Sequence, residues 1–112
     1  ISEAYKEKLL KANDTSTIVT GKRLGHPVRS IKSPLSRNLA KAEYSDISDE
    51  ELDKMAVGSL KAAVADGDIQ HGCFLAGQIV GLVNKEQTAG EIVDEIVKDT
   101  ERVLKEAQKW ER

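Results

Sequence analysis

The chain of 112 residues is predicted to form a mostly helical fold with one or two short β-strands near its beginning. Apolar residues recur at helical spacing over most of the chain. Two hydroxyl residues stand three positions before a glutamate, as in helix capping boxes, and a β-branched run at 15–20 is typical of a strand. The length suits one domain with a modest core, because a barrel of eight strand–helix units needs about 250 residues.

The first part of the chain holds both candidate strands and two of the helices. Residues 2–12 place Ala, Tyr and Leu side chains at helical spacing, with lysine and glutamate between them. The run 15–20 predicts one strand, and the alternation within 28–32 makes that segment the candidate for a second. Ser33 followed by proline is typical of a helix N-cap with proline in the first turn, which predicts a helix over 34–44.

Two capping boxes predict the starts of two later helices. In each box a hydroxyl side chain caps the helix, and a glutamate three residues later reaches back to the cap. Ser48 and Glu51 form the first box. Thr88 and Glu91 form the second, which opens the longest helix, ending near Trp110. A stripe of Ile, Val and Leu along this last helix indicates a face that packs against something apolar.

The most apolar stretch lies between these two helices and predicts a short helix over 74–84. Gly77 and Gly81 stand four apart inside it, and each costs about 1 kcal/mol relative to alanine in a helix. Close packing of another helix against the bare backbone would explain them. This is the interpretation we favour, and the alternative is a flat ligand, such as a flavin ring, lying on that backbone. Gln78 is a neutral donor and acceptor suited to the carbonyl or amide edge of a ligand.

Net charge and cysteine content exclude several classes of protein. The net charge of −2, with both signs interspersed, gives no indication of a nucleic-acid or membrane-surface partner. No apolar run approaches the ~20 residues of a membrane-spanning helix, and no signal-peptide pattern begins the chain. We therefore expect a reduced, cytoplasmic setting. The single cysteine cannot form an internal disulfide and excludes four-cysteine zinc sites.

No constellation typical of a catalytic or metal centre stands out. The two histidines, His26 and His71, lie far apart and no third ligand is indicated, so we predict no metal site. Cys73 and His71 are close enough in sequence to form a dyad. The simpler interpretation, which we favour, places Cys73 in an apolar core and His71 in a turn. A glycine-rich phosphate loop is absent from the sequence.

Three separated motifs stand in an order that is typical of one enzyme family. They are GHPVRSIK at 25–32, GD at 67–68 and AGQIVGLVNKE at 76–86. In this order they resemble the C-terminal part of the bacterial flavin-dependent enoyl-[acyl-carrier-protein] reductases of type II. These reductases are related to the nitronate monooxygenases, also called 2-nitropropane dioxygenases. The similarity extends from the helix at 2–12 to Trp110, and the ordered set of motifs is more specific than any one of them.

This resemblance implies an FMN-dependent (β/α)8 barrel that reduces the double bond of enoyl chains on acyl carrier protein, using NADH or NADPH, in fatty-acid elongation. Residues 1–14 would be the last barrel helix, and residues 15–112 a small helical C-terminal domain over the mouth of the active site. In the family, the strands, the phosphate loops and an essential histidine precede the region that matches this chain. His26 is therefore not that histidine, and we expect the 112 residues alone to be inactive and to bind no FMN.

The resemblance also implies which residues lie near the chemistry. Ala76, Gly77 and Gln78 are expected to be neighbours of the flavin or the substrate, and no residue of this chain is assigned a role as acid, base or nucleophile. Relatives often have Met at the position of Leu75 and a small or β-branched residue at that of Phe74, which would alter a substrate pocket there. Expected partners are the remainder of the barrel, the acyl-carrier-protein-linked substrate and, as a homodimer, a second copy.

Two other functions remain open on the sequence. Nitronate monooxygenases share the barrel and the flavin but oxidise nitroalkanes with oxygen. In a third, non-catalytic hypothesis, the chain is an autonomous helical interaction domain whose long C-terminal helix pairs with a partner. The motifs at 25–32 and 76–86 favour the reductase.

Overall fold

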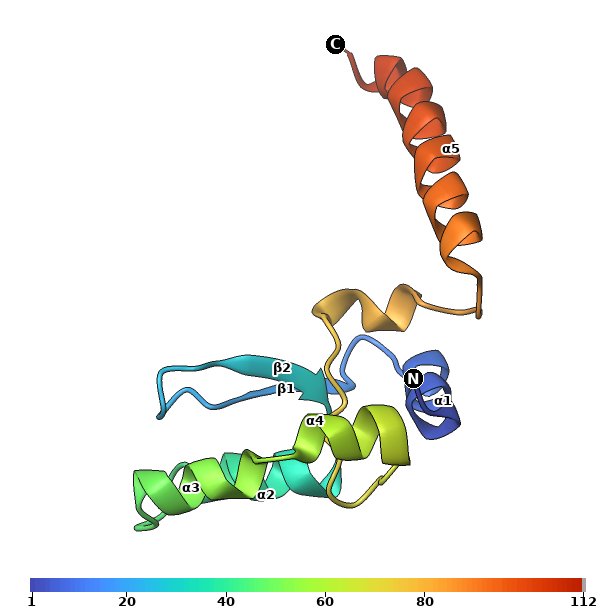
Figure 1. Cartoon of the computed structure of the whole chain (residues 1–112). Helices are drawn as coiled ribbons and strands as arrows, with labels where there is room; N and C mark the ends of the chain where they lie inside the picture. Colours follow the sequence, from blue (N-terminus) through green and yellow to red (C-terminus); the bar gives the residue numbers. More distant parts are fainter. Residues whose placement is uncertain (112) are drawn as a thin grey trace.

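The computed structural model describes residues 1–111 and is mostly helical, with one short β-hairpin (Figure 1). The elements in chain order are α1 (Glu3–Lys11), β1 (Thr17–Thr20), β2 (Val28–Ile31), α2 (Pro34–Ala42), α3 (Asp49–Ala56), α4 (Ser59–Lys61), the π-helix η1 (Ala62–Asp66), the 3-10 helix η2 (Gln78–Leu82), α5 (Ala89–Ala107) and the 3-10 turn η3 (Gln108–Trp110). The predicted fold class is confirmed. Within residues 1–111, no helix is long and apolar enough to cross a membrane.

The strands β1 and β2 pair antiparallel, with Thr17 opposite Ile31 and Thr20 opposite Val28. The loop that joins them closes on a hydrogen bond of 3.0 Å from the His26 N–H to the Gly21 carbonyl. Gly21 has a positive φ of 83°, and a Cβ there would collide with the His26 carbonyl. The first half of the GHPVR motif therefore builds this turn.

The helix predicted over 74–84 is wrong in its first half. Residues 73–76 are extended and pair with β2: the Ile31 N–H donates to the Phe74 carbonyl at 2.8 Å, and Leu75 bridges Ser30. The free edge of β2 offers unpaired backbone groups, and satisfying them outweighs the helical pattern of the local sequence. Only the 3-10 helix η2 remains, so Gly77 and Gly81 do not lie in an α-helix.

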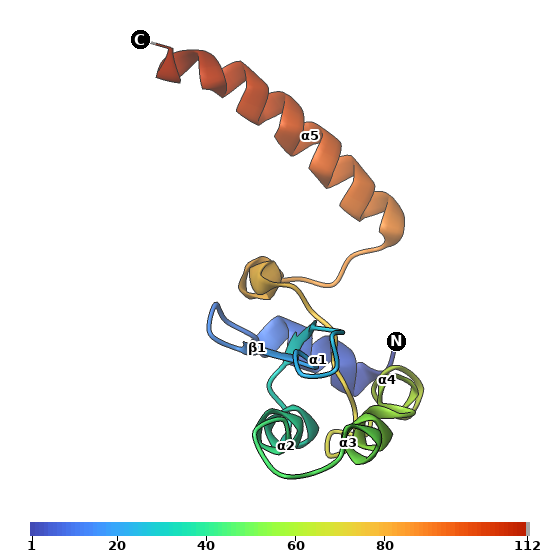
Figure 2. The same ribbon diagram turned by 90° about the vertical axis from the view of Figure 1, so that its left-hand side faces the viewer.

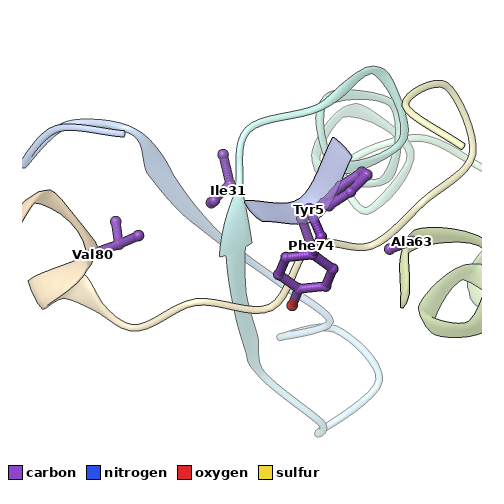
Figure 3. Close-up of a cluster of buried hydrophobic side chains, with 5 residues drawn as sticks. All are labelled: Tyr5, Ile31, Ala63, Phe74 and Val80. Atoms are coloured by element: carbon purple, nitrogen blue, oxygen red, sulfur yellow. The ribbon is translucent and has the colours of Figure 1, made fainter. Parts of the chain in front are cut away.

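One cluster of buried side chains joins α1, β2, η1 and η2 to the extended segment (Figure 3). It contains Tyr5, Ile31, Ala63, Phe74 and Val80. Phe74 has no exposed surface, and the Tyr5 ring meets its ring edge-on at a centroid distance of 5.1 Å. Phe74 therefore faces this core, and the suggestion that its bulk shapes a substrate pocket does not hold.

A second cluster lies between α2 and α3, which run side by side when seen along their axes (Figure 2). Leu35, Leu39 and Leu52 are its buried members. Both helices begin as predicted: Ser33 caps α2 with proline in its first turn, and α3 has the capping box of Ser48 and Glu51. In the view of Figure 1 the hairpin lies above this pair of helices, and Leu24 from its loop packs against the second cluster.

The helix α5 stands away from the rest of the molecule (Figures 1 and 2). The capping box of Thr88 and Glu91 opens it, as predicted. None of its 19 residues is buried, and apolar side chains such as Ile96 and Leu104 are 61% and 66% exposed. At its first turns, Glu95 pairs with the Lys85 ammonium at 2.7 Å. The apolar stripe thus exists, but within residues 1–111 nothing covers it.

Candidate functional site

The segment Ala76-Gly77-Gln78 connects the extended strand-like stretch to η2. Two bonds fix it on one side: the Ala76 N–H donates to the Arg29 carbonyl at 3.3 Å, and the Tyr5 hydroxyl donates to the Leu75 carbonyl at 2.7 Å. Ala76 packs against the core cluster of Figure 3, whereas Gly77 and Gln78 are exposed. Hydrogen bonds and core packing therefore fix one side of this segment, and its other side is open to solvent.

The two glycines of this stretch have different explanations. A Cβ on Gly81 would lie 2.9 Å from backbone atoms of Asn13 and Asp14, so this glycine is required for η2 to pack on the turn after α1. A Cβ on Gly77 would meet nothing within 4 Å, and the φ of Gly77, −75°, suits any residue. Close packing thus explains Gly81. At Gly77 the ligand interpretation remains open.

Unused polar groups surround Gly77. Among residues 1–111, the N–H groups of Gly77, Gln78 and Ile79 donate no hydrogen bond, and neither does the Gln78 side-chain amide. Gln78 and Ile79 line an open hollow of about 480 Å³ with Leu82 and the turn at 12–14. These groups can hydrogen-bond the carbonyl or amide edge of a planar ligand that lies against the bare backbone.

These residues fit one edge of a flavin ring but not its phosphate. Three free N–H groups, an amide and a glycine without a side-chain neighbour suit a flat, polar-edged ring. A flavin phosphate needs converging N–H groups in a glycine-rich loop, usually at a helix start. Residues 1–111 contain no such loop. A phosphate site would have to come from other residues.

The histidine predicted to lie in a turn does so. His71 is exposed, and its Nδ1 lies 2.9 Å from Asp68 Oδ2. Backbone N–H groups of His71 and Gln70 also donate to the Asp68 carboxylate. Hydrogen bonds from the His71 backbone, the His71 ring and the Gln70 backbone hold the Asp68 pKa below its usual value. His71 thus belongs to the Asp68 turn, and no hydrogen bond joins it to Cys73 within the described chain.

Cys73 is half-buried against the second core cluster. Burial raises the pKa of its thiol, and the nearby Ser30 hydroxyl acts in the opposite direction. Ser30 Oγ is itself buried and finds no hydrogen-bond partner of good geometry. A thiol with a raised pKa is a poor nucleophile at neutral pH. No cluster of three or more His, Cys, Asp or Glu side chains that could hold a metal ion occurs in residues 1–111.

A pocket that the sequence did not indicate lies between the hairpin and the pair α2 and α3. Its volume is about 270 Å³, and its lining comes from the hairpin, both helices, Ser59 and the extended segment. His26 and Cys73 are among the lining residues. Because these residues come from five stretches of sequence, no local motif could have predicted it.

Comparisons with known proteins bear on the family and the fold of the chain. The family model for nitronate monooxygenase matches residues 1–99. The structure of FabK from Thermotoga maritima superposes with a TM-score of 0.91 at 32% identity, over 99% of this chain and 35% of that chain. A point mutant of the same protein gives a TM-score of 0.78 at 30% identity, over 98% of this chain and 32% of that one. No curated protein matches the chain.

The chain spans about a third of the length of the FabK structures it matches. A superposition over 99% of the chain includes α5, so the outward position of this helix is part of the shared fold. The fold is that of one part of a FabK barrel enzyme, and the resemblance drawn from the three sequence motifs is confirmed. The family model that matches residues 1–99 shows that this chain belongs to the nitronate monooxygenase family.

Proposed function

We propose that this chain is part of an FMN-dependent oxidoreductase that reduces enoyl chains on acyl carrier protein with NADH or NADPH. The observation that carries the proposal is the likeness to FabK, at 32% identity over 99% of the chain. The family generally uses flavin, and the open face at Gly77 suits a flat ring. A chain with a single half-buried cysteine fits the reduced cytoplasm in which we place the enzyme.

Within this enzyme, the chain contributes contacts that position the reacting groups. FMN, when bound, supplies hydride transfer to the substrate double bond. Gly77 allows close approach of the ring, because its backbone bears no side chain on the open side. The Gln78 amide and the free N–H groups beside it orient the ring edge or the substrate carbonyl. Acid–base groups and the phosphate site come from the barrel.

The barrel is also the proposed partner of α5. The apolar residues of α5 form two adjacent rows, Ile92, Ile96 and Val103 in one and Val93, Val97 and Leu104 in the other. Such a broad stripe suits packing on a globular body, whereas a two-stranded coiled coil uses a narrow seam. About two thirds of FabK lies outside the part that this chain matches, and we propose that its counterpart covers the stripe.

The test is a substitution at Gln78 in the flavoprotein that joins this chain to its barrel. We expect Gln78→Ala to lower the rate of NAD(P)H oxidation with crotonyl thioester about tenfold, as for the loss of one positioning hydrogen bond. Gln70→Ala is the control, because Gln70 is an exposed glutamine on the remote Asp68 turn. Unchanged turnover in Gln78→Ala would contradict the role, provided that its unfolding transition matches the wild type.

Nitronate monooxygenase activity is the second candidate, favoured by the family model that matches residues 1–99. It would appear as oxygen uptake with a nitronate in the absence of NAD(P)H. The exposed stripe of α5 favours a third candidate, a helical interaction domain without catalysis. Failure of the joined protein to bind flavin would favour that third candidate over both enzymes.

A further inference from the structure

The pocket between the hairpin and the helices α2 and α3 has an apolar interior. Leu39 and Leu52 form its floor, with Ala56 at the end of α3, and Val28 and Leu75 contribute from the sheet side. Leu52 is 1% exposed, so the floor is fixed by the second core cluster. The pocket is preformed, has a volume of about 270 Å³ and exposes mostly apolar surface despite the polar residues in its lining, which is typical of sites for small ligands.

The extended segment connects this pocket to the open face at Gly77. In an extended chain, alternate side chains point to the same side. Cys73 and Leu75 line the pocket, whereas Phe74 and Ala76 face the opposite core, in agreement with this alternation. Gly77 is also extended, so its bare side belongs to the face of Leu75, about 7 Å further along the chain. One elongated ligand can therefore contact both places.

The charges around the pocket restrict what can enter it. Glu43 and Asp53 are among the lining residues, and the lining contains no lysine or arginine. The Gly21 N–H donates to the Glu43 carboxylate, which fixes one of these charges at the loop. Carboxylates repel an anionic head group and leave an uncharged alkyl end unaffected. An anionic head group is thus disfavoured inside the pocket, whereas an uncharged alkyl end can enter it.

We propose that this pocket receives the uncharged alkyl end of a thioester-linked acyl chain, while the thioester end lies at Gly77 and Gln78. The inference rests on the proposed reductase function and adds to it the residues that select chain length. Leu39, Leu52 and Leu75 bound the space, and Ala56 leaves part of it empty. Each methylene that enters should tighten binding about fourfold until the pocket is full.

The experiment titrates the whole chain, with ¹³C-labelled methyl groups, with butyryl, hexanoyl and octanoyl thioesters of N-acetylcysteamine. We expect saturable shifts of the Leu39, Leu52 and Leu75 methyl signals, with affinity rising about fourfold per methylene. Shifts confined to Ile79, Leu82 and α5 would overturn the proposal. These side chains are exposed and lie outside the pocket, so such shifts would indicate nonspecific binding to apolar surface.

Two substitutions that change the volume of the pocket in opposite directions test the proposal. Ala56→Leu fills the pocket and should weaken octanoyl binding about tenfold or more, whereas Ala65→Leu, at an exposed position outside the lining, should leave it unchanged. Leu75→Ala enlarges the pocket and should move the best chain to a longer one. Equal effects of Ala56→Leu and Ala65→Leu would overturn the proposal. A preserved methyl spectrum shows that each variant is folded.

The outcome separates this inference from the proposed function. Saturable binding at the three leucines, together with a joined enzyme that consumes no NAD(P)H, would support the pocket and contradict the reductase. Turnover of enoyl thioesters, with no leucine shifts and no change of chain-length profile in Ala56→Leu, would overturn the pocket and leave the reductase in place.

Discussion

The body of the molecule, residues 1–83, and the helix α5 contain the same kinds of apolar side chains in very different surroundings. In the body, Phe74 and Leu52 are almost completely buried. In α5, no residue is buried, although its apolar stripe is at least as regular. The amphipathic pattern therefore predicts a helix and the face it will bury. The pattern does not predict which part of the protein, or which other polypeptide, packs against that face.

Local interactions hold α5 together in the absence of a cover. Its capping box satisfies N–H groups at the start, and Arg102 pairs with Asp99 at 3.3 Å and with Glu106 at 3.6 Å. Such exposed pairs contribute only a few tenths of a kcal/mol each. Most of the stability of a helix in a protein comes from packing of its apolar face, which α5 lacks within residues 1–111. The body has a core of its own, so its stability and that of α5 should respond differently to substitution.

The largest difference is expected between truncations of apolar side chains in the two regions. Phe74→Ala should destabilise the body by about 3–5 kcal/mol, because it leaves a cavity beneath the Tyr5 ring. Leu104→Ala, at a 66% exposed position in α5, should change the free energy of unfolding by less than about 0.5 kcal/mol. Urea denaturation followed by circular dichroism measures both. Equal shifts would mean that α5 packs on the body in solution.

A smaller difference is expected between the two glycines. Gly81→Ala places a Cβ 2.9 Å from the backbone of Asn13 and Asp14 and should destabilise the body by about 1–3 kcal/mol. Gly77→Ala has open space and an ordinary φ, so its effect on thermal unfolding should stay within about 0.5 kcal/mol. A large loss in Gly77→Ala would show that the body needs this glycine for its own packing, contrary to the ligand interpretation.

Features encoded in a few neighbouring residues could be predicted from the sequence. The capping boxes of Ser48 and Thr88 form as expected, because cap and glutamate are three residues apart and need no tertiary partner. The proline after Ser33 starts α2 for the same reason. The turn position of His71 is set by Asp68, three residues earlier.

Features that depend on distant residues could not be predicted. Residues 74–76 belong to the helix predicted over 74–84, but pairing with β2, more than forty residues earlier, makes them extended. The role of Gly81 became visible only through its contact with the turn after α1. Ala76, Gly77 and Gln78 were selected from the resemblance. Their contact with a ligand remains a prediction, which the open face at Gly77 supports.

The smallest predicted effect compares thiol reactivity in the two regions. Only the thiolate reacts with iodoacetamide, and burial raises the pKa of the Cys73 thiol, so less thiolate is present at any given pH. The pH midpoint of its alkylation rate should lie above the ~8.5 of a free cysteine.

Val97→Cys in a Cys73→Ala background places a thiol on the exposed face of α5, which should react several-fold faster at pH 8 with an ordinary midpoint. An equal midpoint for the two thiols would mean that Cys73 is as accessible to solvent as a residue of α5, so that the extended segment is not packed on the body in solution.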